Sequence, residues 1–366
     1  MHRQFVSSFC DPLSGRDLVF VAFEEEGDDL RAGLFFEPAS GNAYCLYRGV
    51  PVFLPGAIPP DFIDRHAGRL RALEREHPAL TIRPGRQTAS WSFSLEWEAH
   101  RDEALDSTWG MTTRSRFEQF LLETGTTEAD IAGRTILDAG CGNGMLTEYL
   151  ARQGSVAFGA DYSTSVFGAE QRRAAPDCCF LQCDLRQLPF RPGTFDVVVS
   201  NGVIHHTPDP EQTFGRVAEK VAGGGRFYLW LYSRKGSVPW RVKRRVFDLL
   251  RAVFSRAPNP VQTNAVRVIT GALHGAYRLA GKPIDRSTLL VNIYDSITPR
   301  WRYYHTPEQV SAWFHAHGFG PVTLTHWDNR YGFGVVATRT PMAQTPGEHY
   351  VARADAGGPN AAGPNA

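Results

Sequence analysis

The sequence has few cysteines, no long apolar run and almost no net charge, and each absence narrows the possibilities. Its 6 cysteines are scattered or fall inside predicted strands, a pattern that excludes a disulfide framework. No apolar run reaches about 18 residues, so we expect no membrane-spanning helix. The first ten residues lack the apolar core of a secretory signal. A formal charge of +1 gives no chain-wide attraction for nucleic acid, and a reducing cytoplasm is the expected compartment.

What the sequence does contain is a glycine-rich turn between a predicted strand and a predicted helix. Residues 135–137 form a short apolar run, which is typical of a central parallel strand, and residues 143–152 have helical spacing. Gly140, Gly142 and Gly144 lie between them and let the backbone turn sharply beside a ligand. The start of the helix presents free N–H groups and a partial positive charge. This combination favours a nucleotide-type cofactor.

Three acidic residues follow the ends of successive predicted strands. Asp138 suits a cationic ligand end, such as an α-amino group, better than a pyrophosphate. Two classes of cofactor compete here, dinucleotides and other nucleoside cofactors. Asp161 lies where an acid binds the ribose diol in either class. Asp184 can accept a hydrogen bond from an adenine amine. The glycines follow a G-x-G-x-G pattern and not the G-x-G-x-x-G pattern of dinucleotide binding, which favours the non-dinucleotide class.

These segments resemble the ordered motifs of class I S-adenosylmethionine-dependent methyltransferases. The motifs are residues 137–144, 159–161, 183–185 and 195–200, within a resemblance that spans about residues 110–232 and, more loosely, 306–340. The resemblance implies an α/β fold, a three-layer α/β/α Rossmann-like sandwich, with S-adenosyl-L-methionine as cofactor. It assigns to that cofactor Asp138, Gly140, Cys141, Gly142, Gly144, Asp161, Tyr162, Asp184, Leu185 and Asn201.

Residues 1–56 resemble the small zinc-ribbon-like module, often called Trm112-like, that precedes some bacterial methyltransferase domains. The two Cys-Pro-x-Cys-Gly knuckles of that module are replaced here. Asp11 and Ser14 stand at the first knuckle, and Glu37 and Ser40 stand at the second. Because structural zinc takes thiolate or imidazole ligands, we predict no metal and turns held by side-chain bonds to the backbone. The alternative is a hard-metal site through the two carboxylates.

Two histidines follow the fourth predicted strand, at the edge where ligands bind in such sheets. His205 and His206 are therefore candidate general bases, although this pair also occurs in family members that need no base. Residues 292–305 combine aromatic and charged side chains, as a polar-substrate pocket does, and Tyr304 and His305 are its candidate catalytic residues. The alternative is an ordinary ordered loop. We expect one cavity to hold members of both segments, namely Asn201, His205, His206, Tyr303, Tyr304 and His305.

The remaining segments are assigned by composition. The predicted divisions are a module at 1–56, a linker and lid at 57–110, a core at 111–233, a helical cap at 234–305, a last helix and β-hairpin at 306–340 and a disordered tail at 341–366.

The lid carries Trp91, Phe93, Trp97 and Trp109, which either line a pocket or dock the lid on the core. Arg114 or Arg116 is a candidate partner for the cofactor carboxylate. Residues 239–256 form a basic amphipathic helix that packs on its own domain, lies on an anionic membrane or meets nucleic acid.

The predicted function is methyl transfer from S-adenosyl-L-methionine to a small polar acceptor, a sugar intermediate or secondary metabolite, on oxygen or nitrogen. An alternative acceptor is rRNA or tRNA, which requires a continuous basic stripe from the N-terminal module to the site. DNA is not expected as a partner. A second alternative is a non-catalytic partner module that keeps the cofactor site. The intact acids Asp138, Asp161 and Asp184 favour a working cofactor site over that alternative.

Overall fold

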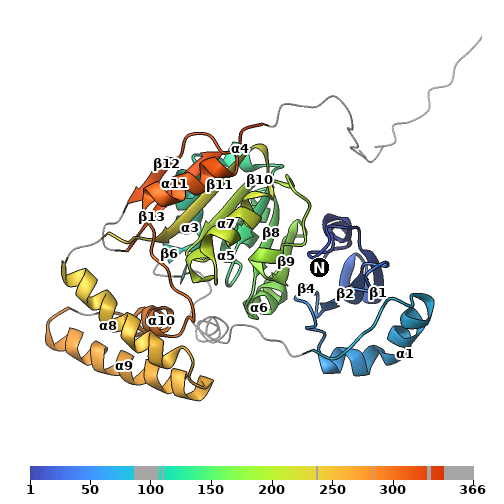
Figure 1. Cartoon of the computed structure of the whole chain (residues 1–366), viewed down its shortest axis with the longest axis horizontal. Helices are drawn as coiled ribbons and strands as arrows, with labels where there is room; N and C mark the ends of the chain where they lie inside the picture. Colours follow the sequence, from blue (N-terminus) through green and yellow to red (C-terminus); the bar gives the residue numbers. More distant parts are fainter. Residues whose placement is uncertain (86–106, 109–110, 236–237, 283, 328–330, 342–366) are drawn as a thin grey trace, which may run out of the picture.

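One mixed sheet organises the computed structural model, which describes residues 1–85, 107–108, 111–235, 238–282, 284–327 and 331–341. Within these residues eleven strands follow the order β1-β2-β3-β4-β9-β8-β7-β10-β11-β13-β12 (Figure 1). The central strands are β7 (Thr135–Ala139), β8 (Val156–Asp161), β9 (Cys178–Cys183), β10 (Phe195–Asn201) and β11 (Val221–Tyr232), and the edge is β12 (Thr323–Trp327) and β13 (Gly332–Thr338). The central strands pair in parallel, whereas β13 runs antiparallel to both β11 and β12. This order confirms the predicted α/β Rossmann-like sandwich.

Helices cover both faces of the central strands. One layer contains α3 (Thr113–Thr124), α5 (Met145–Arg152) and α6 (Ser165–Arg172), and the other contains α7 (Pro210–Ala218), α11 (Pro307–Ala316) and the 3-10 helix η1 (Arg3–Ser8). Shorter elements are α4 (Glu128–Ile131), η2 (Leu185–Gln187), η3 (Ile204–His206), β5 (Ser107–Thr108) and β6 (Met111–Thr112). Alternate strand residues serve opposite layers, because Ile136 packs under α3 and α5 while Leu137 packs in the other layer.

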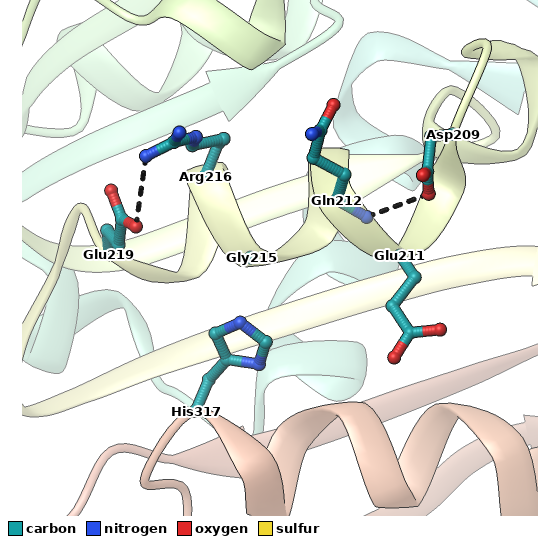
Figure 2. A pocket seen from close by; sticks show the side chains of 7 residues that line it. All are labelled: Asp209, Glu211, Gln212, Gly215, Arg216, Glu219 and His317. Atoms are coloured by element: carbon teal, nitrogen blue, oxygen red, sulfur yellow. Dashed lines mark hydrogen bonds and ion pairs between the residues drawn. The ribbon is translucent and has the colours of Figure 1, made fainter.

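The helix starts follow the sequence signals. Thr306 and Gln309 form a reciprocal capping box at the start of α11, with a proline in its first turn. Asp209 caps α7 by accepting from Gln212 N. Between α7 and the end of α11 lies a surface pocket of about 410 Å³, lined by acidic side chains, Arg216, Gln212 and His317 (Figure 2). Its lining acids are partly engaged, because Glu219 pairs with Arg216 and Asp209 serves as the cap, and we assign the pocket no ligand.

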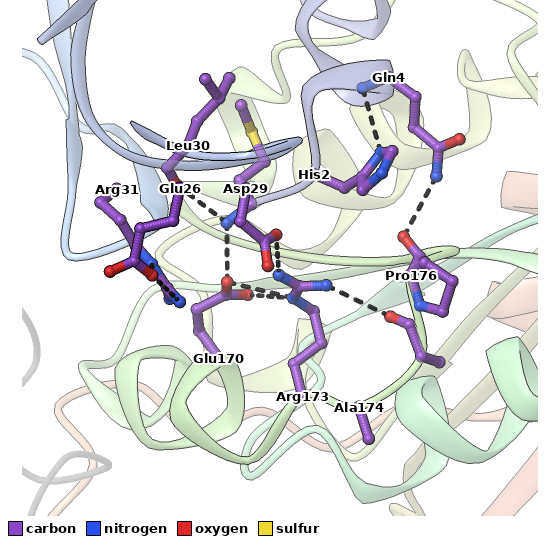
Figure 3. Close-up of polar contacts among 12 residues, drawn as sticks. His2, Gln4, Glu26, Asp29, Leu30, Arg31, Glu170, Arg173, Ala174 and Pro176 are labelled. Carbon is purple, nitrogen blue, oxygen red and sulfur yellow. Dashed lines mark hydrogen bonds and ion pairs between the residues drawn. The ribbon is translucent and has the colours of Figure 1, made fainter. Parts of the chain in front are cut away.

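The N-terminal module extends the main sheet. Its antiparallel strands are β1 (Val19–Glu26), β2 (Asp29–Phe36), β3 (Ala43–Tyr47) and β4 (Val50–Phe53), followed by α1 (Pro60–Glu76). Strand β4 pairs in parallel with β9 of the core. Buried charges reinforce the junction, because Arg173 of α6 contacts Asp29 at 2.5 Å and Glu170 at 3.1 Å (Figure 3). Glu170 also accepts from the Met1 amino group at 2.7 Å.

The cap is a helical unit with its own small hydrophobic core. It consists of α8 (Val238–Phe254), α9 (Asn259–Leu279) and α10 (Arg286–Ile297), and it projects from the sheet at the lower left of Figure 1. The prediction of a loop over 292–305 is wrong for its first half, which belongs to α10. Leu289, Ile293 and Ile297 are spaced four residues apart and pack in the cap core, which explains the helix.

Helix α8 packs on its own domain through only part of its apolar side chains. Phe247, Leu250 and Phe254 pack in the cap core, whereas four members of the predicted apolar face, Val242, Val246, Leu249 and Val253, are exposed. Among the described helices, none is long and apolar enough to cross a bilayer. The four aromatic residues predicted for the lid and the predicted tail from residue 342 lie outside the described residues.

Candidate functional site

The glycine turn lies at the carboxyl end of β7, in the middle of the sheet. Gly140 has a φ of +96° and Gly144 a φ of +76°, values that favour glycine. A Cβ on Gly140 would lie 2.2 Å from Val203 Cγ2, and one on Gly144 would lie 2.4 Å from Phe180 Cε1. Side chains from β9 and from the segment after β10 therefore press on the turn, and a residue larger than glycine would displace it from the sheet edge.

Asp138 and Arg116 form a pair of complementary charges behind this turn. Asp138 is buried, and its Oδ2 accepts from Thr147 Oγ1 at 2.8 Å. Burial raises the pKa of the Asp138 carboxyl to about 6, against the lowering effects of Thr147 and the Arg116 charge. Arg116 donates to Glu123 at 2.9 Å, but its Nη2 is buried without a hydrogen-bond partner among the described residues. Of the two predicted arginines, Arg114 is instead exposed and pairs with Glu118.

Asp161 joins the second strand end to the glycine turn. Its Oδ2 accepts from Gly142 N at 2.8 Å, and its Oδ1 accepts from Ser163 N at 2.8 Å and Ser163 Oγ at 2.7 Å. Ser165 Oγ also donates to Gly142 O at 2.6 Å. The carboxylate is half-buried and fixed in orientation. A carboxylate has about four lone-pair directions, and three are used here, so Asp161 retains acceptor capacity for about one further hydroxyl.

Asp184 lies at the predicted strand end, but a residue of its own loop already contacts its carboxylate. Arg186 approaches Asp184 Oδ2 at 2.6 Å, and Arg186 N donates to Oδ1 at 2.9 Å. An adenine amine therefore competes with this ion pair for the carboxylate. The other predicted cofactor residues differ in exposure: Leu185 and Cys141 are buried, while Tyr162 and Asn201 are half-buried. Tyr162 packs against the cluster under the N-terminal module.

All six cysteines are buried and unpaired, as their strand positions predicted. Burial raises the pKa of the Cys141, Cys178 and Cys183 thiols well above the usual value. Thiols in this state are poor nucleophiles and poor ligands. Cys141 therefore contributes its backbone and volume to the glycine turn.

The four knuckle positions of the N-terminal module bond to their own turns. Asp11 is buried and accepts from Ser14 Oγ at 2.6 Å, Asn42 Nδ2 at 3.0 Å and Tyr44 Oη at 2.7 Å. Glu37 accepts from backbone N–H groups at the second turn, including Ser40 N at 2.6 Å. Although burial raises it, the pKa of Asp11 is held below its usual range by these hydrogen bonds. Within the described residues no group of three or more His, Cys, Asp or Glu can hold a metal ion.

On the opposite side of the site, His206 is held between two acceptors. Its Nδ1 lies 2.9 Å from Trp301 O, and its Nε2 lies 3.1 Å from Asp295 Oδ1. The carbonyl and the carboxylate together fix the orientation of the His206 ring.

Asp295 of α10 and Arg302 complete this buried group. Tyr232 Oη donates to Asp295 Oδ2 at 2.5 Å, and Arg302 Nη1 lies 3.5 Å from the same oxygen. Although burial alone raises it, the Arg302 charge and hydrogen bonds from His206 and Tyr232 hold the pKa of Asp295 below its usual range. Arg302 lies over the Tyr232 ring, and its Nε is buried without a hydrogen-bond partner in the described part of the chain. Arg302 and the His206 ring thus face one carboxylate.

His205 differs from its neighbour. It is fully buried, and neither ring nitrogen has a hydrogen-bond partner among the described residues. Its ring centroid lies 4.1 Å from that of Tyr232 and 4.4 Å from that of His206. Burial and the nearby His206 charge lower the pKa of His205 well below its usual value, so the ring is neutral. The two candidate bases are therefore chemically distinct.

The segment after α10 contributes the remaining predicted residues. Tyr304 Oη lies 3.5 Å from Asp248 of α8, and Arg244 lies over the Tyr304 ring at 4.5 Å. His305 packs on Trp313, and burial lowers its pKa to about 4. Tyr303 is further out and donates its Oη to Pro208 O. The structure brings His205 and His206, which follow β10, beside the 292–305 segment, while the single cavity expected for them stays a prediction.

Tyr232 is the member of this group that the sequence argument missed. It is the last residue of β11, so the rule that ligands meet the carboxyl ends of parallel strands is a signal that could have identified it. Its ring contacts His205 and lies 6.0 Å from Tyr304, and its Oη bonds to Asp295. It therefore links the strand ends to the cap.

The fold and the site define a class, a Rossmann-like protein with a glycine turn and three acids at the ends of adjacent strands. Residues 137–229 match the family described as a methyltransferase domain. This match confirms the predicted cofactor, S-adenosyl-L-methionine.

Individual relatives are similar over shorter segments. The chain is 33% identical over 123 residues to an uncharacterised protein of Synechococcus, covering 32% of this chain and 30% of that one. It is 32% identical over 108 residues to the ubiquinone biosynthesis O-methyltransferase of Methylococcus capsulatus, covering 28% and 46%. A solved magnesium protoporphyrin IX methyltransferase from Synechocystis PCC 6803 aligns with a TM-score of 0.39 and 17% identity over 66% of this chain and 84% of that one. The match spans less than half the length of both curated relatives.

Proposed function

We propose that the chain is an S-adenosyl-L-methionine-dependent methyltransferase that acts on a small polar acceptor. The observation that carries the proposal is the position of Asp138, Asp161 and Asp184 at the ends of three adjacent parallel strands, β7, β8 and β9. The methyltransferase-domain match over residues 137–229 supports the same conclusion.

The residues at the glycine turn fit the cofactor on electrostatic grounds. Its amino acid end carries one ammonium and one carboxylate, and the site offers a buried carboxyl on Asp138 and an unpaired guanidinium nitrogen on Arg116. In this assignment Asp161 holds the ribose hydroxyls and Asp184 the adenine amine. S-adenosyl-L-methionine, when bound, supplies an electrophilic methyl group on a sulfonium.

The acceptor side has one group suited to take a proton and one suited to stay charged. His205 is neutral and has unpaired ring nitrogens, so it can accept a proton from a hydroxyl or amine once an acceptor reaches it. Arg302 places positive charge near it, which stabilises developing negative charge on an acceptor oxygen. The ubiquinone O-methyltransferases among the relatives support a hydroxyl acceptor over an amine.

Charge distribution argues against the RNA alternative. Residues 1–56 hold four arginines and eight acidic residues, a formal charge of −4. An RNA enzyme of this layout requires a basic stripe from the module to the site. The acidic module supports a small acceptor. The Trm112-like assignment of residues 1–56 remains a proposal based on sequence resemblance.

Calorimetry with S-adenosyl-L-methionine tests the cofactor half of the proposal. Asp161→Ala is expected to weaken binding by about 2–4 kcal/mol, because charge-assisted bonds to the ribose are lost. Asp17→Ala, which changes an exposed acid in the module, is the matched control and leaves affinity unchanged. Equal affinity for Asp161→Ala and wild type, or tight NAD binding by wild type, would contradict the assignment.

Transfer of a labelled methyl group tests the acceptor half, with small-molecule extracts as the acceptor source. His205→Gln and Tyr304→Phe are expected to lower turnover about 10²-fold or less while leaving cofactor affinity nearly unchanged. His317→Gln, at the pocket between α7 and α11, is the control. Labelling of RNA in place of small molecules would move the acceptor to the alternative class. A loss of cofactor affinity in both variants would show that these residues do not act on the acceptor.

A further inference from the structure

Helix α8 presents an apolar ridge that nothing in the described structure covers. Val238, Val242, Val246, Leu249 and Val253 are all exposed, and Leu249 is 70% exposed. Their spacing of three or four residues places them along one face of the helix. The neighbouring face of the helix, which carries Phe247, Leu250 and Phe254, packs in the cap core. The ridge is therefore a continuous apolar surface along the whole of α8.

The cap that carries this ridge also concentrates the positive charge of the chain. Residues 238–297 hold ten lysines and arginines against three aspartates, a formal charge of +7, while the whole chain has +1. Two of those aspartates are engaged internally, Asp295 with His206 and Asp248 with Arg251 at 2.8 Å. Arg241 and Arg245, by contrast, are exposed on α8 next to the ridge. Positive charge beside an apolar ridge complements a surface that is apolar inside and anionic outside.

We propose that α8 docks on an anionic lipid bilayer, with the ridge inserted among the acyl chains near the headgroups. Amphipathic helices bind such surfaces by burying apolar side chains while basic residues meet the anionic headgroups. A nucleic acid satisfies the arginines alone. The bilayer satisfies both the arginines and the valine and leucine side chains, which is why we commit to it.

The position of α8 gives this docking a consequence for the acceptor. Asp248 and Arg244 of α8 contact Tyr304, so the helix that meets the bilayer also touches the candidate acceptor group. An acceptor dissolved in the bilayer then reaches the site from the membrane side. This consequence rests on the proposed function, whereas the docking itself does not.

Vesicle sedimentation with the full-length protein tests the proposal. Wild type is expected to bind phosphatidylcholine vesicles that contain about 30% phosphatidylglycerol, and to bind pure phosphatidylcholine much more weakly. Leu249→Asn should lower the partition about 5-fold and Leu249→Asn with Val253→Asn about 20-fold, because each removes buried apolar area. Arg241→Gln with Arg245→Gln should lower it about 10-fold, and raised salt should weaken wild-type binding.

Matched controls distinguish binding through the ridge from nonspecific adsorption of the protein to vesicles. Leu122→Asn removes a leucine that is 80% exposed on α3 of the core, and Arg65→Gln removes an exposed arginine of α1. Neither should change vesicle binding. All substituted ridge side chains are exposed, so circular dichroism and thermal unfolding should match wild type.

Several results would overturn the proposal. One is wild-type protein that fails to bind the anionic vesicles, and another is binding that the ridge variants leave unchanged. If the protein instead forms dimers that Leu249→Asn dissociates, the ridge meets a second copy of the chain. If the arginine variants abolish RNA binding while the leucine variant does not, the cap meets nucleic acid. Vesicle binding without methyl transfer would leave the docking intact and count against the proposed function alone.

Discussion

The two knuckle turns of the N-terminal module and the polar group around Asp295 use buried carboxylates in opposite ways. Asp11 accepts from three side chains of its own module, and each of those donors is satisfied by the contact. Asp295 lies among groups that remain partly unsatisfied, since His205 and the Nε of Arg302 have no hydrogen-bond partner in the described residues. Unpaired buried polar groups cost free energy, so their persistence indicates a ligand site more than a structural one. The first region is a closed network and the second an incomplete one.

The largest expected effect comes from removing the carboxylate of the incomplete network. Asp295→Ala leaves Arg302 as an uncompensated buried charge and removes the carboxylate partner of His206, and we expect a loss of about 3–5 kcal/mol in the free energy of unfolding. Denaturant titration measures it. Asp248→Ala, at a more exposed ion pair of the same cap, is the control and should lose much less. Equal stability of the Asp295 variant and wild type would mean that Asp295 does not compensate the Arg302 charge.

The closed network should give a smaller loss with no effect on chemistry. Asp11→Ala leaves the buried Tyr44 hydroxyl without its acceptor, and we expect a loss of about 2–3 kcal/mol in the free energy of unfolding. Asp11→Asn, which keeps one acceptor oxygen, should lose less. Cofactor affinity should stay at the wild-type value in both variants. A variant that remained stable but lost cofactor binding would place Asp11 in a functional role and erase the contrast between the two regions.

Acidification should reveal the neutral histidines of the incomplete network. Burial lowers the pKa of His305 to about 4, below its unfolded value of about 6.5. The folded state then binds fewer protons than the unfolded state. The stabilising contribution of the neutral His305 is present above pH 6.5 and is lost as the pH falls through about 4. Relative to His305→Gln, wild type should therefore lose about 2 kcal/mol more between pH 7 and pH 4, by thermal or urea unfolding. Parallel pH profiles for the two proteins would contradict the assignment.

The smallest expected effect is on metal content. Because Asp11 and Glu37 already bond to their turns, elemental analysis of the purified protein should find no stoichiometric zinc. A chelator should leave the unfolding temperature unchanged, since a structural zinc contributes directly to folding. One zinc per chain, or unfolding on chelation, would show that the knuckles were aligned wrongly and that both regions are ligand sites.

The parts of the fold that the sequence predicted are those with local causes. The apolar run of β7, the glycines after it and the acids at the strand ends depend on neighbours within a few residues. The caps of α7 and α11 follow from Asp209 and Thr306 for the same reason. The loop predicted over 292–305 failed because its polar residues hid the four-residue apolar spacing of α10.

The sequence by itself determined the class of fold, the cofactor turn and its acids, and the absence of a disulfide framework. The tertiary structure alone decided which of two adjacent histidines is paired, which of Arg114 and Arg116 faces inward, and which side of α8 is left uncovered. Those outcomes depend on contacts between distant positions, such as His206 with Trp301 across 95 residues. Charge state and pairing are set by burial and by partners, and neither can be read from residue spacing along the chain.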